Sequence, residues 1–157
     1  MCKFISSIGF KNGDIICNPN IDSHEDLIHS FELKESKMRN WIRLEFYPNL
    51  NTEYHLIGKY KLHIDDDIVS WITEELKEKW IKKLKVILKR IIITESKYCL
   101  SGSTYILNGN ILINKLIYCR IFNAGNSIIE NAGNSTIKYA GNSIIENAGN
   151  SIIINKR

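Results

Sequence analysis

Residues 124–155 read AGNSIIEN-AGNSTIKY-AGNSIIEN-AGNSIIIN, an eight-residue unit repeated in succession. A period of eight residues matches neither the heptad of a coiled coil nor the longer units of helical solenoids. Each unit places Gly-Asn, a turn signal, before a pair of residues that is mostly β-branched. The repeat therefore predicts one short strand and one tight corner per octad.

The octad register extends towards the N-terminus beyond the visible repeat. One octad position holds isoleucine throughout: Ile113, Ile121, Ile129, Ile137, Ile145 and Ile153. Gly109-Asn110 keeps the register of Gly125-Asn126, although Ile117 replaces the turn glycine between them. We therefore expect the stacked region to begin near Leu100, earlier than the obvious repeat.

The octad leaves the closure of the coil open. One octad, about 25 Å long when extended, cannot close a coil around side chains. Two octads per coil would give a flattened solenoid, three a triangular one, and three intertwined chains a trimer. In each form the isoleucine position fills the interior, alanines such as Ala124 occupy tight space, and Asn126 and its equivalents stack at corners. We favour the single-chain solenoid.

These Gly-Asn octads resemble the β-helical octapeptide repeats of phage tail spikes and type VI secretion spikes. The resemblance covers the last third of the chain, and the Val-x-Gly spacing of those proteins is missing. It implies a trimeric β-helix and a structural, oligomerising role.

Composition places the chain among small globular proteins. It has 157 residues and a formal net charge of +4, which permits acidic partners without requiring them. No stretch reaches the apolar length of a membrane span, and the start, MCKFISSIGFKNGD, lacks the pattern of a signal peptide. The four cysteines lack CxxC spacing, so we expect reduced thiols in a bacterial cytoplasm.

The segment before the repeat predicts a small sheet. Phe4–Phe10 and Asp14–Cys17 are β-leaning runs joined at Asn12-Gly13, the strongest short hairpin signal. Further strands are expected at Trp41–Tyr47 and Ile57–Ile64.

Two helices complete the predicted head. Ser23 caps a short helix through Phe31, with Asp26 three residues on in a variant capping box. A long helix from about Ile68 to Ile92 is opened by Asp65–Asp67 and closed by basic residues. Its apolar stripe comprises Ile72, Leu76, Trp80, Leu84, Ile87, Leu88 and Ile91. The sequence thus predicts an α+β head at residues 1–97, a small antiparallel sheet with one long amphipathic helix, followed by a C-terminal β-solenoid of octapeptide repeats at residues 98–157.

Two motifs resemble catalytic or metal-binding patterns. Removal of Met1 would leave Cys2 as an N-terminal nucleophile, oriented by His24 and Asp26, but we favour a small buried residue on the first strand. The segment His24–His29, HEDLIH, spaces its histidines at i and i+5, whereas a zinc helix needs i and i+4. We therefore expect no metal, no cofactor and no catalytic residue.

The long helix carries a strongly basic face, which suits phosphates without base specificity. Its expected binding residues are Lys77, Lys82, Lys83, Lys85, Lys89 and Arg90, with Lys79 nearby. An ordinary solvated face is the alternative interpretation.

The final octad ends in Ile152, Ile153 and Ile154, with only Lys156 and Arg157 beyond them to discourage edge pairing. We expect these three isoleucines to mediate a homo-oligomer, a dimer or trimer assembled through residues 124–154.

The segments MCKFISSIGFKNGDIIC, DSHEDLI and RLEFYP resemble small uncharacterised phage and prophage proteins that share a Met-Cys start, a DSHEDL-type segment, an amphipathic helix and a repeat tail. The resemblance implies a mobile-element origin. We therefore expect a non-enzymatic protein that binds a bacterial protein or ribonucleoprotein complex, with no membrane role, as a host-defence inhibitor of the anti-CRISPR kind. A spike-like structural protein and a Cys2 hydrolase are the alternatives.

Overall fold

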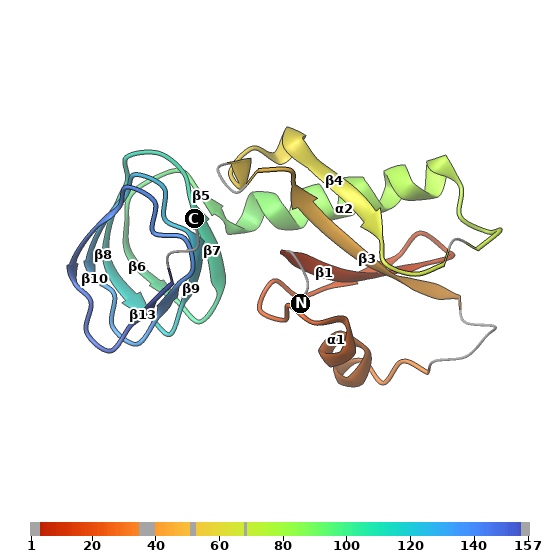
Figure 1. Ribbon diagram of the computed structural model, residues 1–157, viewed down its shortest axis with the longest axis horizontal. Helices are drawn as coiled ribbons and strands as arrows, with labels where there is room; N and C mark the ends of the chain where they lie inside the picture. The colour runs from red at the N-terminus through yellow and green to blue at the C-terminus, as the bar shows by residue number, and fades with distance from the viewer. Residues whose placement is uncertain (1–3, 35–39, 51–52, 68, 155–157) are drawn as a thin grey trace. The chain divides into compact units, whose positions relative to one another are not determined.

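The computed structural model describes residues 4–34, 40–50, 53–67 and 69–154. The chain forms two units, Met1–Leu88 and Lys89–Arg157, here called the head unit and the solenoid unit. The division falls within the last turn of the long helix, whereas the sequence placed it after residue 97. The predicted fold class, an α+β head followed by a β-solenoid, is confirmed (Figure 1).

The head unit is built on a four-stranded antiparallel sheet in the order β2-β1-β3-β4. Its strands are β1 (Ile5–Phe10), β2 (Ile15–Cys17), β3 (Trp41–Pro48) and β4 (Tyr60–Ile64). The hairpin between β1 and β2 is confirmed, and the Asn12 side chain accepts a hydrogen bond from the Asp14 backbone N–H at 3.0 Å. The strand expected from Ile57 begins only at Tyr60, because Ile57–Lys59 forms a short 3-10 helix, η2.

Helices cover both faces of this sheet (Figure 1). Side chains alternate along a strand, so Ile42 and Leu44 point one way and Trp41 the other. Ile42 and Leu44 pack with Leu76 and Trp80 of α2 (Glu74–Ile91). Trp41 packs instead with Ile8 of β1 and with Leu27 of α1 (His24–Ser30). As predicted, the Ser23 hydroxyl caps α1, accepting from the Asp26 backbone N–H at 3.1 Å.

The long helix α2 begins later than the sequence predicted. It starts at Glu74, where the Thr73 hydroxyl accepts a hydrogen bond from the Leu76 backbone N–H at 3.2 Å. The expected opening aspartates are used elsewhere, because Asp66 accepts from the backbone N–H and Nη1 of Arg43 on β3 at 2.6 and 3.0 Å. Ile68, the expected first helical residue, lies outside the described residues.

The solenoid unit consists of two parallel sheets that share one interior (Figure 1). One sheet has the order β12-β10-β8-β6, from strands β6 (Lys97–Ser101), β8 (Leu112–Ile117), β10 (Ile128–Asn131) and β12 (Ile144–Asn147). The other has the order β13-β11-β9-β7-β5, from β5 (Ile92–Ile93), β7 (Thr104–Leu107), β9 (Arg120–Asn123), β11 (Thr136–Ile137) and β13 (Ile152–Ile153). The solenoid therefore starts at Ile92, ahead of the expected Leu100.

Strand register shows that each coil takes two octads, the flattened form among the predicted closures. Ile129 is aligned with Ile113 on one side and Ile145 on the other, a spacing of sixteen residues. Ile137 is aligned with Ile121 and Ile153 on the opposite sheet. The isoleucine column of the sequence is thus two columns that face each other across the interior.

The corners explain why each of the four octads in residues 124–155 contains glycine. Gly133 and Gly141 have φ angles of 56° and 60°, in the left-handed region that glycine adopts without strain. A Cβ on Gly141 would lie 2.7 Å from the carbonyl oxygen of Gly125, one coil earlier. Conformation and space both exclude a side chain at these corners.

Several corners are supported by a different asparagine from the expected one. Asn123 and Asn131, which precede the Ala-Gly pair, accept through Oδ1 from the backbone N–H of Gly125 and Gly133 at 2.8 and 2.9 Å. Asn126, the expected ladder residue, is exposed. Alanine does occupy tight space as predicted, because Ala124 is fully buried.

Ile137 gives the sharpest test of the interior. It is fully buried between the neighbouring coils, so Ile137→Asp should lower the free energy of unfolding by about 4 kcal/mol. The matched control is Thr136→Asp on the same strand, because Thr136 is half-buried and aligned with Arg120. Urea unfolding followed by circular dichroism measures both, and equal losses would contradict the assigned inside and outside of β11.

Lys138, which follows Ile137 in the sequence, would be a poorer control than Thr136 for the Ile137 variant. The sequence predicts an outward and energetically neutral side chain. The Lys138 ammonium instead lies 4.5 Å from the ring centre of Phe122 and 5.9 Å from that of Tyr139. Removing this cation–π contact would cost about 0.5–1 kcal/mol.

Candidate functional site

The basic residues of α2 separate into two groups. Lys82, Lys85 and Lys89 follow the spacing i, i+3, i+7 and therefore share one face of the helix. This face is turned away from the buried Leu84 and Leu88. We call these three lysines the basic face.

Within the described residues, no lysine of the basic face takes part in an ion pair. Lys82 and Lys89 are exposed and Lys85 is half-buried. Arg90, in the last turn, is also exposed and has no ion pair in the described part of the chain. These cations are available to an anionic partner.

The other predicted lysines are neutralised by carboxylates of the head unit. Lys77 pairs with Glu74 at 2.7 Å, and Lys79 with Glu75 at 2.8 Å. Lys83 reaches the hairpin and pairs with Asp14 at 2.8 Å, and this hydrogen bond lowers the pKa of Asp14. Lys77 and Lys83 therefore have structural partners, and we do not count them in the basic face.

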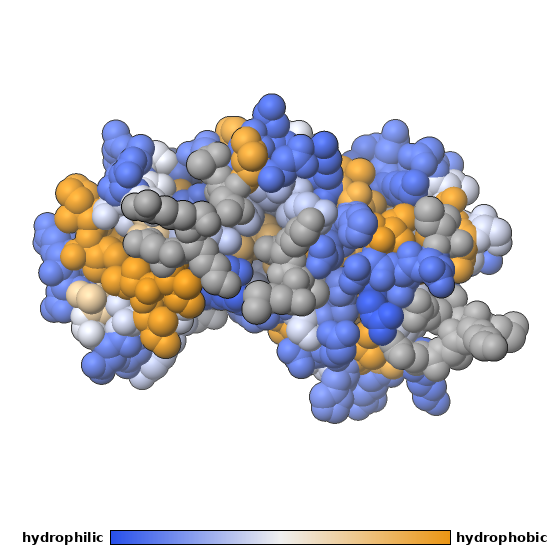
Figure 2. Space-filling view, viewed as in Figure 1, coloured by the Kyte–Doolittle hydropathy of each residue, from blue (hydrophilic) through white to orange (hydrophobic). Residues whose placement is uncertain are grey.

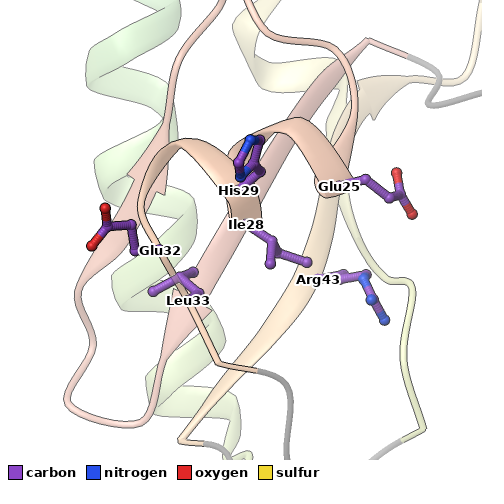
Figure 3. A pocket seen from close by; sticks show the side chains of 6 residues that line it. All are labelled: Glu25, Ile28, His29, Glu32, Leu33 and Arg43. Carbon is purple, nitrogen blue, oxygen red and sulfur yellow. The ribbon is translucent and has the colours of Figure 1, made fainter.

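A shallow cleft of about 560 Å³ opens beside α1 (Figure 3). Its lining combines acidic, basic and aliphatic side chains: Glu25, Ile28, His29, Glu32, Leu33 and Arg43. Figure 3 shows the two glutamates at opposite ends of the helical segment, with Ile28 and Leu33 between them. No sequence motif marks this cleft, because Arg43 comes from β3 and meets α1 only through folding.

Two charged side chains of the cleft, Arg43 and Glu25, form hydrogen bonds within the head unit. Arg43 donates to Asp66 through Nη1 and its backbone N–H. Glu25 accepts from its own backbone N–H and from the Ser23 hydroxyl, which lowers the pKa of its carboxyl group. Two charged side chains of the cleft, Glu25 and Arg43, are therefore held by hydrogen bonds beside the aliphatic side chains of Ile28 and Leu33.

The two histidines of the HEDLIH segment do not meet at one site. His24 is buried, and its Nε2 lies 2.9 Å from the Leu44 carbonyl oxygen, while Nδ1 lies 3.5 Å from Asp65. His29 is exposed at the rim of the cleft. The described residues contain no cluster of three or more histidine, cysteine, aspartate or glutamate side chains that could hold a metal.

The described cysteines are free thiols. Burial raises the pKa of Cys17 to about 12 and raises that of Cys119 as well, so both resist forming the reactive thiolate. Cys99 is exposed. Cys2, the predicted nucleophile, lies outside the described residues, and its role stays a prediction.

The predicted self-association residues are exposed at the end of the solenoid. Ile152, Ile153 and Ile154 are 61%, 42% and 38% exposed. Sequence reasoning missed a second feature, an aliphatic row across the outer face of β8, β10 and β12 formed by Leu112, Ile128 and Ile144. These three residues are aligned only because each coil has sixteen residues. Figure 2 shows a large hydrophobic area on the solenoid unit.

No helix among the described residues is long and apolar enough to cross a bilayer. Comparison with known proteins gave no relative, because no protein-family model, curated protein or solved structure matches the chain.

Proposed function

We propose that this chain is a non-enzymatic binding protein of the phage or prophage type, which docks on a bacterial macromolecular complex through the basic face of α2. The observation that carries the proposal is the row Lys82, Lys85 and Lys89, accessible and without ion pairs among the described residues. A rigid helix holds these cations in a fixed line, so they can attract several phosphates or carboxylates at once.

The chemistry of the basic face favours a ribonucleoprotein as partner. Lysines bind phosphates as point charges and do not select a base sequence, so RNA phosphates inside a larger complex fit this face. RNA-guided defence complexes in the bacterial cytoplasm offer such a surface. We therefore propose an inhibitor of host defence of the anti-CRISPR kind, acting without a cofactor.

Neutralising the basic face should weaken RNA binding. In the triple variant Lys82→Gln, Lys85→Gln and Lys89→Gln, the buried stripe is untouched, so the head should fold normally. Binding to a single-stranded RNA homopolymer, measured by fluorescence anisotropy across a salt titration, should show a salt slope reduced in magnitude by about 2.

The matched control is the triple variant Lys77→Gln, Lys79→Gln and Lys83→Gln, which removes the same charge from lysines that already have carboxylate partners. This control should keep most of the salt slope. Equal losses in both variants would show that net charge alone determines binding and would refute the basic face.

A plasmid-interference assay tests the biological form of the proposal. Expression of the chain in strains that each carry one CRISPR effector should restore transformation by a targeted plasmid in at least one strain. The variant of the basic face should lose this protection, and the control triple variant should keep it. If the chain protects the plasmid from none of the effectors, the anti-CRISPR proposal fails.

A second candidate function is that of a structural, oligomerising β-helix component of the phage-spike kind. The observation in its favour is the exposure of Ile152, Ile153 and Ile154 at the end of the solenoid. Under this proposal the solenoid assembles copies of the chain.

A further inference from the structure

The outer face of the sheet β12-β10-β8-β6 is built in rows that cross the strands and follow the stacking direction of the coils. Ile128 is aligned with Leu112 on one side and with Ile144 on the other. Ile128 is 38% exposed, whereas the next residue, Ile129, is fully buried in the interior. The three aligned side chains therefore point away from the interior. We call Leu112, Ile128 and Ile144 the aliphatic row.

Different polar side chains border the aliphatic row on its two sides. Two residues further along each strand, the same face carries Asn114, Glu130 and Glu146. Asn114 donates through Nδ2 to Glu130 Oε2 at 2.6 Å, across neighbouring strands. Two residues before each member of the row lies an exposed asparagine at a corner: Asn110, Asn126 and Asn142. One border of the row is therefore acidic, and the other consists of uncharged amides.

The repeat distance of the aliphatic row indicates which surface fits it. Successive members of the row are one coil apart, about 4.8 Å. A helix advances about 5.4 Å per turn, and successive side chains on one face of a strand are about 6.6 Å apart, so neither stays in step with the row. A second solenoid has the same coil spacing and stays in step. The aliphatic row is therefore best matched by the same row of another copy.

The polar borders select one orientation of two facing copies. With a two-fold axis perpendicular to the row, the acidic borders would face each other, and like charges would oppose docking. With the axis parallel to the row, each acidic border faces the asparagines of the other copy, and Glu130 can accept from the Asn126 amide. Asn114 and Glu130 already make this kind of hydrogen bond within one chain.

We propose that two copies of this chain pack face to face through the aliphatic row, about a two-fold axis parallel to that row. The inference rests on the self-association proposed above and assigns it to the outer face of β8, β10 and β12. A two-fold contact closes at two copies. Four strands about 4.8 Å apart, with about five residues each, give a footprint of only about 300 Å² per copy. We therefore expect a weak dimer, with a Kd on the order of 10 µM.

Sedimentation equilibrium of the full chain tests the surface. The chain should associate reversibly from its 18.1 kDa monomer to a dimer of about 36 kDa. Ile128→Glu places carboxylates of the two copies opposite each other and should weaken the dimer at least about 30-fold. The matched control is Ile153→Glu, because Ile153 is 42% exposed but belongs to β13 of the other sheet, and it should leave the dimer intact. Urea unfolding checks that both variants are folded.

A charge swap tests the orientation. Asn126→Asp places a second carboxylate opposite Glu130 and should weaken the dimer about 10-fold. Combining Asn126→Asp with Glu130→Lys places opposite charges across the interface and should restore dimerisation. If the acidic borders faced each other instead, the double variant would place lysine against lysine and would stay monomeric.

The outcomes separate this inference from the functions proposed above. If Ile153→Glu dissociates the dimer and Ile128→Glu does not, self-association stands and the face-to-face inference falls. A monomer at about 100 µM would overturn both. A trimer, a fibre or a double variant that stays monomeric would each overturn the inference. All of these variants keep the basic face, so their RNA binding tests the first proposed function separately.

Discussion

The fit of one coil on the next, sixteen residues further along the chain, is the constraint on which the solenoid depends. Gly141 packs so closely on the carbonyl of Gly125 that no side chain fits between them. The same stacking aligns Ile129 with Ile145 and buries the isoleucine interior. Each coil therefore supplies both hydrogen bonds and apolar cover to its neighbour.

In the head unit, the long helix α2 has one side packed on the sheet and another side that is basic. The apolar side of α2 packs on Ile42 and Leu44, and several of its lysines are tied to nearby carboxylates. The lysines of the basic face differ because none of them takes part in an ion pair among the described residues. The α2 helix therefore separates a structural surface from one that is available to a partner.

Much of this architecture could be predicted from local sequence signals. The octad predicted strands and corners, and the Asn12-Gly13 turn and the Ser23 cap predicted the hairpin and the short helix. Closure into sixteen-residue coils could not be predicted, because one octad has the same local pattern in a flat, triangular or intertwined coil. The early start at Ile92 was hidden as well, because the first coil lacks the Gly-Asn signal.

Long-range contacts account for the parts of the head and the candidate sites that sequence reasoning missed. From the sequence, Asp66 was expected to open the long helix. In the structure Asp66 accepts a hydrogen bond from Arg43, and the helix begins at Glu74. The partner of Lys83 is Asp14, far away in the sequence, so a list of basic residues could not show which of them are neutralised. The cleft beside α1 likewise forms only when β3 reaches the helix.

Disulfide trapping between corner positions tests the sixteen-residue coil most directly. Asn126 and Asn142 occupy equivalent exposed corners of adjacent coils, about 4.8 Å apart, a spacing within reach of a disulfide. The double variant Asn126→Cys, Asn142→Cys should form an intramolecular disulfide that mass spectrometry maps, and Asn126→Cys with Asn134→Cys should not. A disulfide between positions 126 and 150, or one that forms only between chains, would contradict the flattened single-chain solenoid.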